Sequence, residues 1–200
     1  AVCQRWYRDM FCASGTSYDA IDSEAAKAPP GSNGVFFHPY LQGERSPYWD
    51  ANLRGSFTGM SMANTRGDIA RALLEGVAFS LRDCYRTIEK MKLPVNEFLL
   101  IGGGAKSAFW KQLQADIYGC EIATISSDQG PAFGAAIMAG VGTGVYGSIP
   151  EACDAIIRVV ERTAPNAANA KEYNEYYEVY RNLYPSIRSA CHTLSHKVSA

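Results

Sequence analysis

The stretch EFLLIGGGAKSAFWKQLQADIYGCEIATIS, residues 97–126, carries the pattern that decides the fold class of this chain. Its first part is an apolar run of strand length that ends in three glycines. Residues 107–118 repeat apolar side chains at helical spacing, and Gly119 follows as a typical C-terminal cap. Residues 121–126 are again of strand length. This order predicts a strand, a glycine turn, a helix and a second strand, which is an α/β arrangement.

The segments on either side continue the alternation of strands and helices. Residues 34–41 are an apolar run typical of a buried strand, and residues 56–63 predict a second strand in which Gly59 marks a bulge or a close backbone approach. The longest helix is expected to begin at the Thr-x-x-Asp motif of residues 65–68 and to end before Pro94. Further helices are expected over residues 1–12, 18–27, 130–144, 151–165 and 168–191, the fourth running into a short extended piece.

Two of these helices predict a particular kind of packing. Residues 130–144 are rich in glycine and alanine, which favours a helix pressed tightly against its neighbours. Residues 168–191 repeat tyrosine at helical spacing, which predicts a face docked on the body of the domain. Pro185 is expected to kink or interrupt that helix, because proline lacks the backbone N–H. The tyrosines of this face are Tyr173, Tyr177, Tyr180 and Tyr184.

Composition limits the possible functions. The chain has 200 residues, 47% of them hydrophobic, which is enough for one large domain. Its 19 basic and 20 acidic residues nearly balance, so nucleic acid is not an expected partner. No apolar run has the length of a membrane span, and six scattered cysteines are typical of reduced thiols in a cytoplasmic protein. The chain starts within a helical pattern and without methionine, which we interpret as a piece of a longer protein.

The three glycines allow several interpretations. A phosphate-binding P-loop needs glycine directly before its lysine, but Ala105 precedes Lys106 here, so this motif is excluded. In a dinucleotide fingerprint Gly102 and Gly104 fit the first two positions, whereas serine replaces the third glycine. Asp128 lies roughly where the acid that binds the ribose belongs.

A third interpretation is the adenosine-binding glycine turn of actin-like ATPases. There a bare backbone lets the nucleotide lie against the chain, and the next helix offers its N-terminus. A tight turn without any ligand is the fourth possibility. From the turn itself, the last three interpretations stay open.

The surrounding sequence resembles a known family. Residues 55–83, GSFTGMSMANTRGDIARALLEGVAFSLRD, resemble the second signature of the FGGY carbohydrate kinases. Residues 34–50 are similar to the loop that precedes this signature, and residues 101–119 and 130–140 to motifs on the nucleotide side. The resemblance covers nearly the whole chain and is strongest to members that phosphorylate xylulose. The positions that match the signature are Gly55, Phe57, Gly59, Met60, Asp68, Ile69, Ala72, Leu73, Leu74 and Glu75.

The resemblance implies both a fold and an activity. FGGY kinases have two actin-like (ribonuclease H-like) domains hinged over a cleft, with helices layered around a mixed sheet. They transfer the γ-phosphoryl group of ATP to a sugar hydroxyl with Mg²⁺, and the expected sugar here is D-xylulose, giving xylulose 5-phosphate. Residues 1–200 resemble the C-terminal, nucleotide-binding domain. The residues that the resemblance places at the nucleotide are Gly102, Gly103, Gly104, Ala105, Ala108 and Arg5.

The resemblance also implies what this chain lacks. In this family the general base is an aspartate of the N-terminal domain, which also binds most of the sugar, and that motif does not occur here. We therefore expect no catalytic residue in this chain, no activity of the chain alone and weak binding of ATP or ADP. Five carboxylates that could act as substitutes have simpler structural roles. Asp128 is expected to hydrogen-bond the turn ahead of Pro131, and the others to start a helix or lie on helix surfaces: Asp68, Glu75, Asp83 and Asp116.

Three further expectations complete the prediction. The three histidines do not cluster at metal-binding spacing, so no metal site is expected in this chain. An alternative function is a non-catalytic actin-fold module that senses nucleotide or serves assembly, for instance as a homodimer. A less favoured alternative is a Rossmann-type NAD-binding domain, against which the missing third glycine argues.

Overall fold

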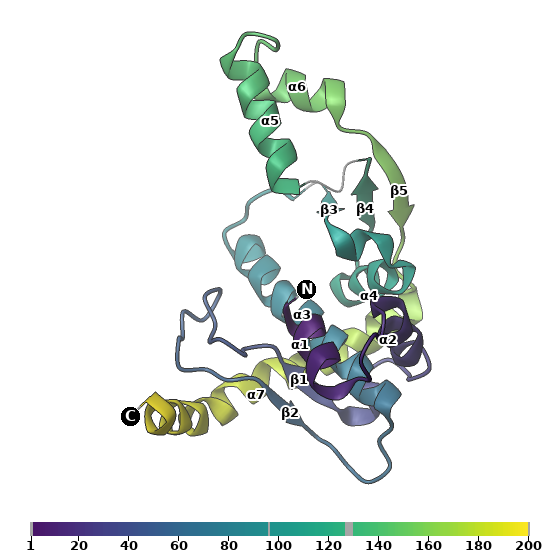
Figure 1. Cartoon of the computed structure of the whole chain (residues 1–200), viewed down its shortest axis with the longest axis vertical. Helices are drawn as coiled ribbons and strands as arrows, with labels where there is room; N and C mark the ends of the chain where they lie inside the picture. Colours follow the sequence, from purple (N-terminus) through teal and green to yellow (C-terminus); the bar gives the residue numbers. More distant parts are fainter. Residues whose placement is uncertain (1, 96, 127–129, 200) are drawn as a thin grey trace.

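The lower body of the molecule is built around one long helix, α3, which is flanked by a short hairpin and three other helices (Figure 1). The computed structural model describes residues 2–95, 97–126 and 130–199. Residues from both ends of the chain meet in this body, because the C-terminal helix passes along α3. Its elements are α1 (Val2–Phe11), α2 (Tyr18–Ala25), η1 (Ser32–Gly34), β1 (Phe36–His38), β2 (Ser56–Thr58), α3 (Arg66–Lys90) and α7 (Ala167–Ser199).

A second group of elements rises from this body and carries the glycine turn (Figure 1). Helix α4 connects the two groups, since it packs against both α3 and α7. Helices α5 and α6 form a projection at the far end. The elements of this group are β3 (Phe98–Leu100), η2 (Gly103–Lys106), α4 (Ala108–Tyr118), β4 (Ile122–Ile125), α5 (Gly130–Gly142), α6 (Ile149–Ile156) and β5 (Val159–Thr163).

The strands form two separate sheets among the described residues. Strands β1 and β2 are antiparallel, with Phe37 opposite Phe57. In the order β3-β4-β5, the first pair is parallel and the second antiparallel, so this sheet is mixed, as predicted. The hairpin strands are shorter than predicted because β2 ends before Gly59. A Cβ on Gly59 would lie 2.2 Å from the carbonyl oxygen of Gly34, so the close backbone approach expected there is confirmed.

Local capping signals set the helix boundaries. Thr65 and Asp68 form a complete capping box at the start of α3, as the Thr-x-x-Asp motif predicted. Ser107 caps α4, whose last turn is closed by Gly119 with a φ of 68°. The long helix buries residues such as Leu73 and Phe79 in its first half. Its second half is more exposed than the apolar spacing predicted, since Leu81 and Ile88 are exposed, although Asp83 there still contacts α7.

Helix α7 confirms the docked tyrosine face. Tyr173, Tyr177 and Tyr180 are fully buried, and Tyr184 stacks on Tyr48 with ring centroids 3.8 Å apart. Of the two outcomes expected at Pro185, a kink or an interruption, the interruption is wrong, since the helix continues to Ser199. Buried side chains on both sides of the proline, including Cys191, hold the two halves against the body. This packing outweighs the loss of one backbone hydrogen bond.

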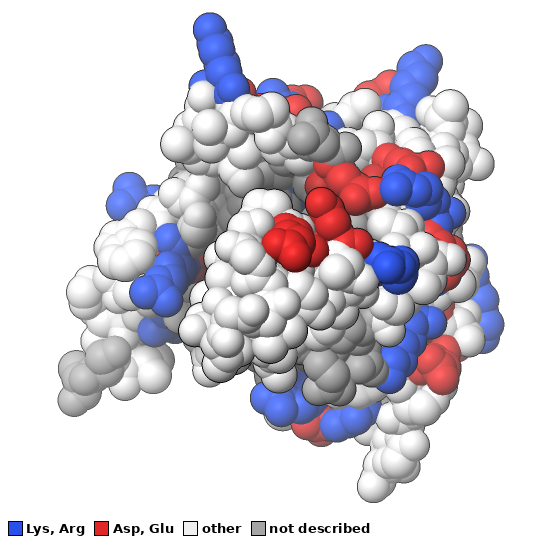
Figure 2. Space-filling model, turned by 90° about the horizontal axis from the view of Figure 1, so that it is seen from above, with Lys and Arg blue, Asp and Glu red and all other residues white. Residues whose placement is uncertain are grey.

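The expectation that residues 130–144 pack tightly against their neighbours is wrong. Among the described residues of α5 only Ile137 is buried, and a Cβ on Gly134 would meet no atom within 4 Å. Helix α5 packs mainly on α6, and both stand away from the body (Figure 1). Viewed onto this end, the molecule shows a broad uncharged surface with acidic side chains at one side (Figure 2). Small residues allow a helix to pack closely, but close packing also needs a neighbouring element, and here α5 packs mainly on α6.

Three carboxylates that were expected on helix surfaces are buried. Glu75, Asp83 and Asp116 are each less than 7% exposed. Glu75 accepts hydrogen bonds from the side chains of Arg71 at 2.8 Å and Tyr173 at 2.7 Å. Asp83 and Asp116 likewise accept hydrogen bonds from residues on or next to α7. Their role is structural, as predicted, but they act as internal hydrogen-bond acceptors that join α3 and α4 to α7.

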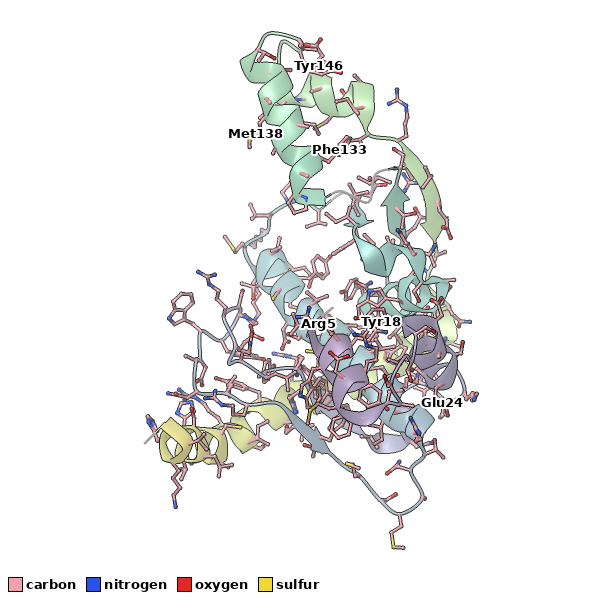
Figure 3. All side chains as sticks on the ribbon, in the orientation of Figure 1. Arg5, Tyr18, Glu24, Phe133, Met138 and Tyr146 are labelled. Atoms are coloured by element: carbon pink, nitrogen blue, oxygen red, sulfur yellow. The ribbon has the colours of Figure 1, made fainter. Side chains whose placement is uncertain are left out.

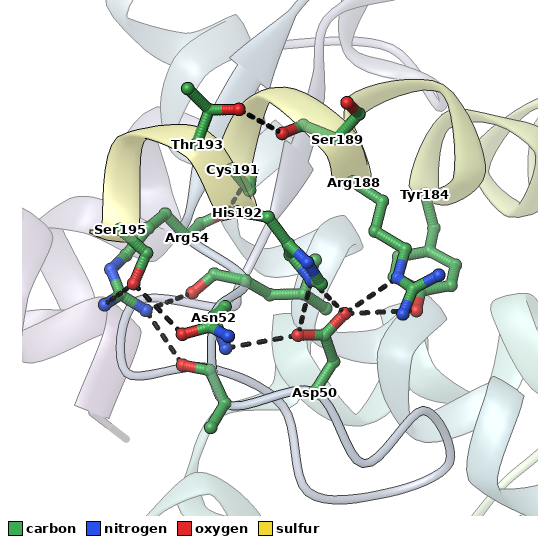
Figure 4. A network of polar contacts seen from close by, with 12 residues as sticks. Asp50, Asn52, Arg54, Tyr184, Arg188, Ser189, Cys191, His192, Thr193 and Ser195 are labelled. Carbon is green, nitrogen blue, oxygen red and sulfur yellow. Dashed lines mark hydrogen bonds and ion pairs between the residues drawn. The ribbon is translucent and has the colours of Figure 1, made fainter. Parts of the chain in front are cut away.

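A fourth carboxylate joins the loop after β1 to the end of α7. Asp50 is 6% exposed and lies 2.7 Å from Nε2 of His192 and 3.1 Å from Nε of Arg188 (Figure 4). Although burial opposes it, hydrogen bonds from His192 and Arg188 hold the pKa of Asp50 below its usual range. The contact with Asp50 thus fixes His192 to this loop.

Candidate functional site

A hollow of about 250 Å³ lies beside the glycine turn, where four helices meet. Helix α3 forms an apolar floor, and Trp110 of α4 forms a wall. Helices α1 and α2 contribute polar side chains, and the turn contributes bare backbone. The lining residues are Gln4, Tyr18, Asp19, Asp22, Leu73, Leu74, Val77, Gly103, Gly104, Lys106, Ser107 and Trp110.

Each of the three glycines meets a different condition. Gly102 has a φ of 76° and a ψ of −168°, a conformation that side chains other than hydrogen rarely allow. A Cβ on Gly104 would lie 2.9 Å from the ring of Trp110, so this position requires glycine for packing. A Cβ on Gly103 would meet nothing within 4 Å. Gly103 therefore leaves open space at the hollow, where a ligand can approach the backbone.

The helix after the turn offers an anion-binding end. Ser107 is the N-cap of α4, and its hydroxyl accepts a hydrogen bond from Trp110 N at 3.0 Å. Helix N-termini carry a partial positive charge and free N–H groups, both of which favour phosphate. Since Ser107 and the glycines line the same hollow, a phosphate chain on the turn would lie at this helix end.

The polar side of the hollow is centred on Asp22. Gln4 Nε2 donates to Asp22 Oδ1 at 2.8 Å, and the Ser107 hydroxyl donates to Oδ2 at 2.5 Å. Burial raises the pKa of Asp22 above its usual range, against the opposing effect of these two hydrogen bonds. Asp19 on the same helix adds to the rise in pKa. The hollow thus combines an apolar floor, a flat aromatic wall and acceptor groups, which suits a planar heterocycle with attached phosphates.

The structure brings together only part of the predicted nucleotide site. Gly103 and Gly104 line the hollow, and Gly102 begins the turn. Ala105 lies within the turn and Ala108 begins α4, but neither lines the hollow. Arg5 is exposed on α1 (Figure 3), and the hollow is lined by its neighbour Gln4 instead.

Apart from Gly103 and Gly104, the sequence did not predict the residues that line this hollow, among them Gln4, Tyr18, Asp22 and Trp110. The helical spacing of Trp110 predicted that it points inward, but the turn and α1–α2 are too far apart in sequence for any local motif to connect them. Residues 130–140, which resemble a nucleotide-side motif, do not line the hollow. Phe133, Met138 and Tyr146 belong to the projection, well away from Arg5 and Tyr18 (Figure 3). Asp128 lies outside the described residues.

The described residues show no arrangement suited to a metal ion and no disulfide. Across residues 2–95, 97–126 and 130–199, no group of three His, Cys, Asp or Glu side chains is placed to hold a metal ion. All six cysteines are free thiols, as expected. None of the described helices is long and apolar enough to span a bilayer.

Comparisons with known proteins match this chain to one part of carbohydrate kinases. Residues 3–143 match the family model of the FGGY family of carbohydrate kinases, C-terminal domain. The chain is 42% identical to a xylulose kinase of Staphylococcus epidermidis over 179 residues, which is 90% of this chain and 36% of that protein. It is 35% identical to a gluconokinase of Bacillus subtilis over 192 residues, or 91% of this chain and 37% of that protein.

A solved structure extends the likeness to three dimensions. The ligand-bound xylulose kinase from Lactobacillus acidophilus superposes with a TM-score of 0.88 at 28% identity, covering 96% of this chain and 39% of that one. The chain therefore spans well under half the length of the proteins that it matches.

Proposed function

The chain belongs to the FGGY family of carbohydrate kinases, and from this premise we propose that residues 1–200 are the C-terminal, nucleotide-binding domain of an ATP-dependent sugar kinase. The predicted actin-like α/β fold is that of the solved kinases that the chain resembles. The observation that carries the proposal is the hollow at the glycine turn, where bare backbone, a helix N-terminus and the ring of Trp110 meet.

In this proposal the chain holds ATP or ADP. The apolar side chains of α3 and the Trp110 ring would contact the adenosine, and the glycine turn would let the phosphates approach the N-terminus of α4. The kinase would use Mg²⁺ bound to the nucleotide phosphates. The described part of this chain offers no cluster of ligands for the ion, so we assign it no residue here.

The sugar and the catalytic base belong to the rest of the proposed kinase. Phosphoryl transfer depends mainly on positioning and on charge neutralisation, which two domains closing over a cleft provide while excluding water. D-xylulose is the proposed sugar, because a xylulose kinase of Staphylococcus epidermidis is 42% identical. Gluconate is the alternative, because a gluconokinase is 35% identical. The general base would be an aspartate outside residues 1–200.

Nucleotide binding at the turn is tested by filling the open space at Gly103. We expect Gly103→Leu to weaken ADP binding at least tenfold, measured by titration calorimetry on the 200-residue chain, because the new side chain occupies space beside the backbone. Gly134→Leu on α5 is the matched control, since a Cβ there also meets no atom within 4 Å. Equal ADP affinities for both variants would remove the turn from the site, and binding of NAD in place of ADP would favour a Rossmann-type domain.

A further inference from the structure

Ser107 is the residue through which the glycine turn is tied to the body. It directly follows η2, its backbone N–H donates to Gly104 O at 3.1 Å, and its hydroxyl caps α4. A serine hydroxyl has one proton to donate. That proton goes to Asp22 of α2, 85 positions earlier in the chain, over 2.5 Å. Since the oxygen must also accept from Trp110 N, the carboxylate determines which way the hydroxyl points.

Asp22 is itself held on a second side. Gln4 of α1 donates to its other oxygen, so one carboxylate joins α1, α2 and the start of α4. Hydrogen bonds of a neutral donor to a carboxylate at this distance are among the stronger ones in proteins. Gln4, Asp22 and Ser107 all line the hollow beside Gly103 and Gly104.

The sign of the charge distinguishes two possible roles of Asp22. A carboxylate beside the phosphates of a nucleotide repels them, so direct contact with an anionic ligand would weaken binding. As an acceptor for Ser107, the same carboxylate holds the end of the turn and the N-terminus of α4 in place. The geometry favours the second role, because both of its oxygens already accept hydrogen bonds from the protein.

We propose that Asp22 is a positioning residue of the nucleotide site, acting through Ser107 to hold the glycine turn and the N-terminus of α4 in the conformation that binds phosphate. This rests on the proposed function of the hollow. Removing the Asp22 carboxylate therefore weakens nucleotide binding, even though it removes a negative charge next to an anionic ligand.

The test compares two aspartates of α2 by ADP calorimetry. Asp22→Ala is expected to weaken ADP binding about tenfold. Asp19→Ala removes the same charge from the rim of the hollow but has no part in the contact with Ser107, so it is expected to tighten binding severalfold. Asp22→Asn keeps an acceptor for Ser107, while the Gln4 amide can turn to accept from the new amide. It is expected to restore binding to within about threefold of the original chain. If Asp22→Ala does not fold, Ser107→Ala removes the same contact from the other side and is expected to weaken ADP binding about tenfold.

A double-mutant cycle tests the route through Ser107. In a Ser107→Ala background, Asp22→Ala is expected to change ADP affinity less than twofold, because the contact is already absent. Tighter or unchanged binding by Asp22→Ala, or an equal tenfold loss in both backgrounds, would overturn the positioning role. If Asp22→Ala did not weaken ADP binding but Gly103→Leu abolished it, the proposed function would stand and only the positioning role of Asp22 would fail. If the original chain bound no ADP, the proposed function would fail and this inference with it.

Discussion

His38 is a histidine that the fold removes from water. It is fully buried in β1, stacks on Tyr180 with ring centroids 4.9 Å apart, and has a contact of 3.3 Å between Nδ1 and Ser56 Oγ. Burial lowers the pKa of His38 to about 4. No carboxylate is paired with it in any described ion pair or hydrogen bond, so the ring stays neutral in the folded protein at neutral pH.

This burial predicts an acid-sensitive fold. The pKa of an unfolded histidine is about 6.5, so below that value the unfolded chain binds a proton that folded His38 does not. The contribution is fully present above pH 6.5 and is lost as the pH falls toward 4. We expect His38 to account for a loss of about 2 kcal/mol in the free energy of unfolding between pH 7 and pH 5. Urea titrations at both pH values would measure it.

A matched variant isolates this histidine from the other titrating groups. His38→Phe keeps an aromatic ring against Tyr180 but cannot be protonated. The difference in stability between pH 7 and pH 5 should shrink by about 2 kcal/mol in this variant. An unchanged pH dependence would show that His38 is protonated in the folded state or that another group causes the loss.

At the scale of elements, α7 depends on the loop between β1 and β2. Its first half is held by buried tyrosines, whereas its last turns are held by Asp50 through Arg188 and His192 and by a hydrogen bond of 2.6 Å from Arg54 to Ser195 (Figure 4). Without these contacts, the helix after Pro185 would lose much of its attachment. The proline does not end the helix because both halves have their own partners.

We therefore expect Asp50→Ala to release the last turns of α7. The side chains of Arg188 and His192 lose a buried acceptor, which costs about 2 kcal/mol of unfolding free energy for hydrogen bonds of this kind. Hydrogen exchange should accelerate at least tenfold in residues 188–199 and much less in residues 167–180. Asp9→Ala, which removes the exposed pair with Arg8, is the control and should change stability by less than about 0.5 kcal/mol. Equal exchange in both variants would contradict the attachment.

At the scale of the whole molecule, one flank of the chain is unusually apolar. Leu81 and Ile88 of α3 are exposed, as are Leu99 and Ile101 at or next to the edge strand β3. Parallel strands are normally covered on both faces, and exposed apolar edges favour association. The glycine turn lies between this flank and the hollow. The chain therefore exposes apolar side chains that no described residue covers.

The whole chain is also the scale at which catalytic activity is expected to be absent. Asp22 in the hollow accepts hydrogen bonds from two protein donors, so it is not available as a general base. We expect the 200-residue chain with ATP, Mg²⁺ and D-xylulose or gluconate to form no sugar phosphate above the rate without protein, measured by mass spectrometry. Sugar phosphate formed by the original chain but not by Gly103→Leu would contradict this and would place a base in this chain.

Much of the fold could be predicted because its signals are local. The capping box of Thr65 and Asp68, the caps of α4 and the tyrosine spacing of α7 each depend on residues within a few turns. The glycine turn was recognised in the same way, and the family followed from ordered motifs along the chain. Gly103 and Gly104 lie together at one hollow, and their binding of nucleotide stays a prediction.

The rest depended on contacts between distant segments, which no local pattern encodes. Burial of Glu75, the pairing of Asp50 with His192 and the exposure of α5 follow from which surfaces happen to meet. By itself the sequence determined the elements, the glycine turn and the family, because helix caps, strand lengths and ordered motifs are short-range properties. Only the tertiary structure decided that Gln4 and Asp22 complete the hollow at the glycine turn, because helix packing brings them to Ser107 across the chain.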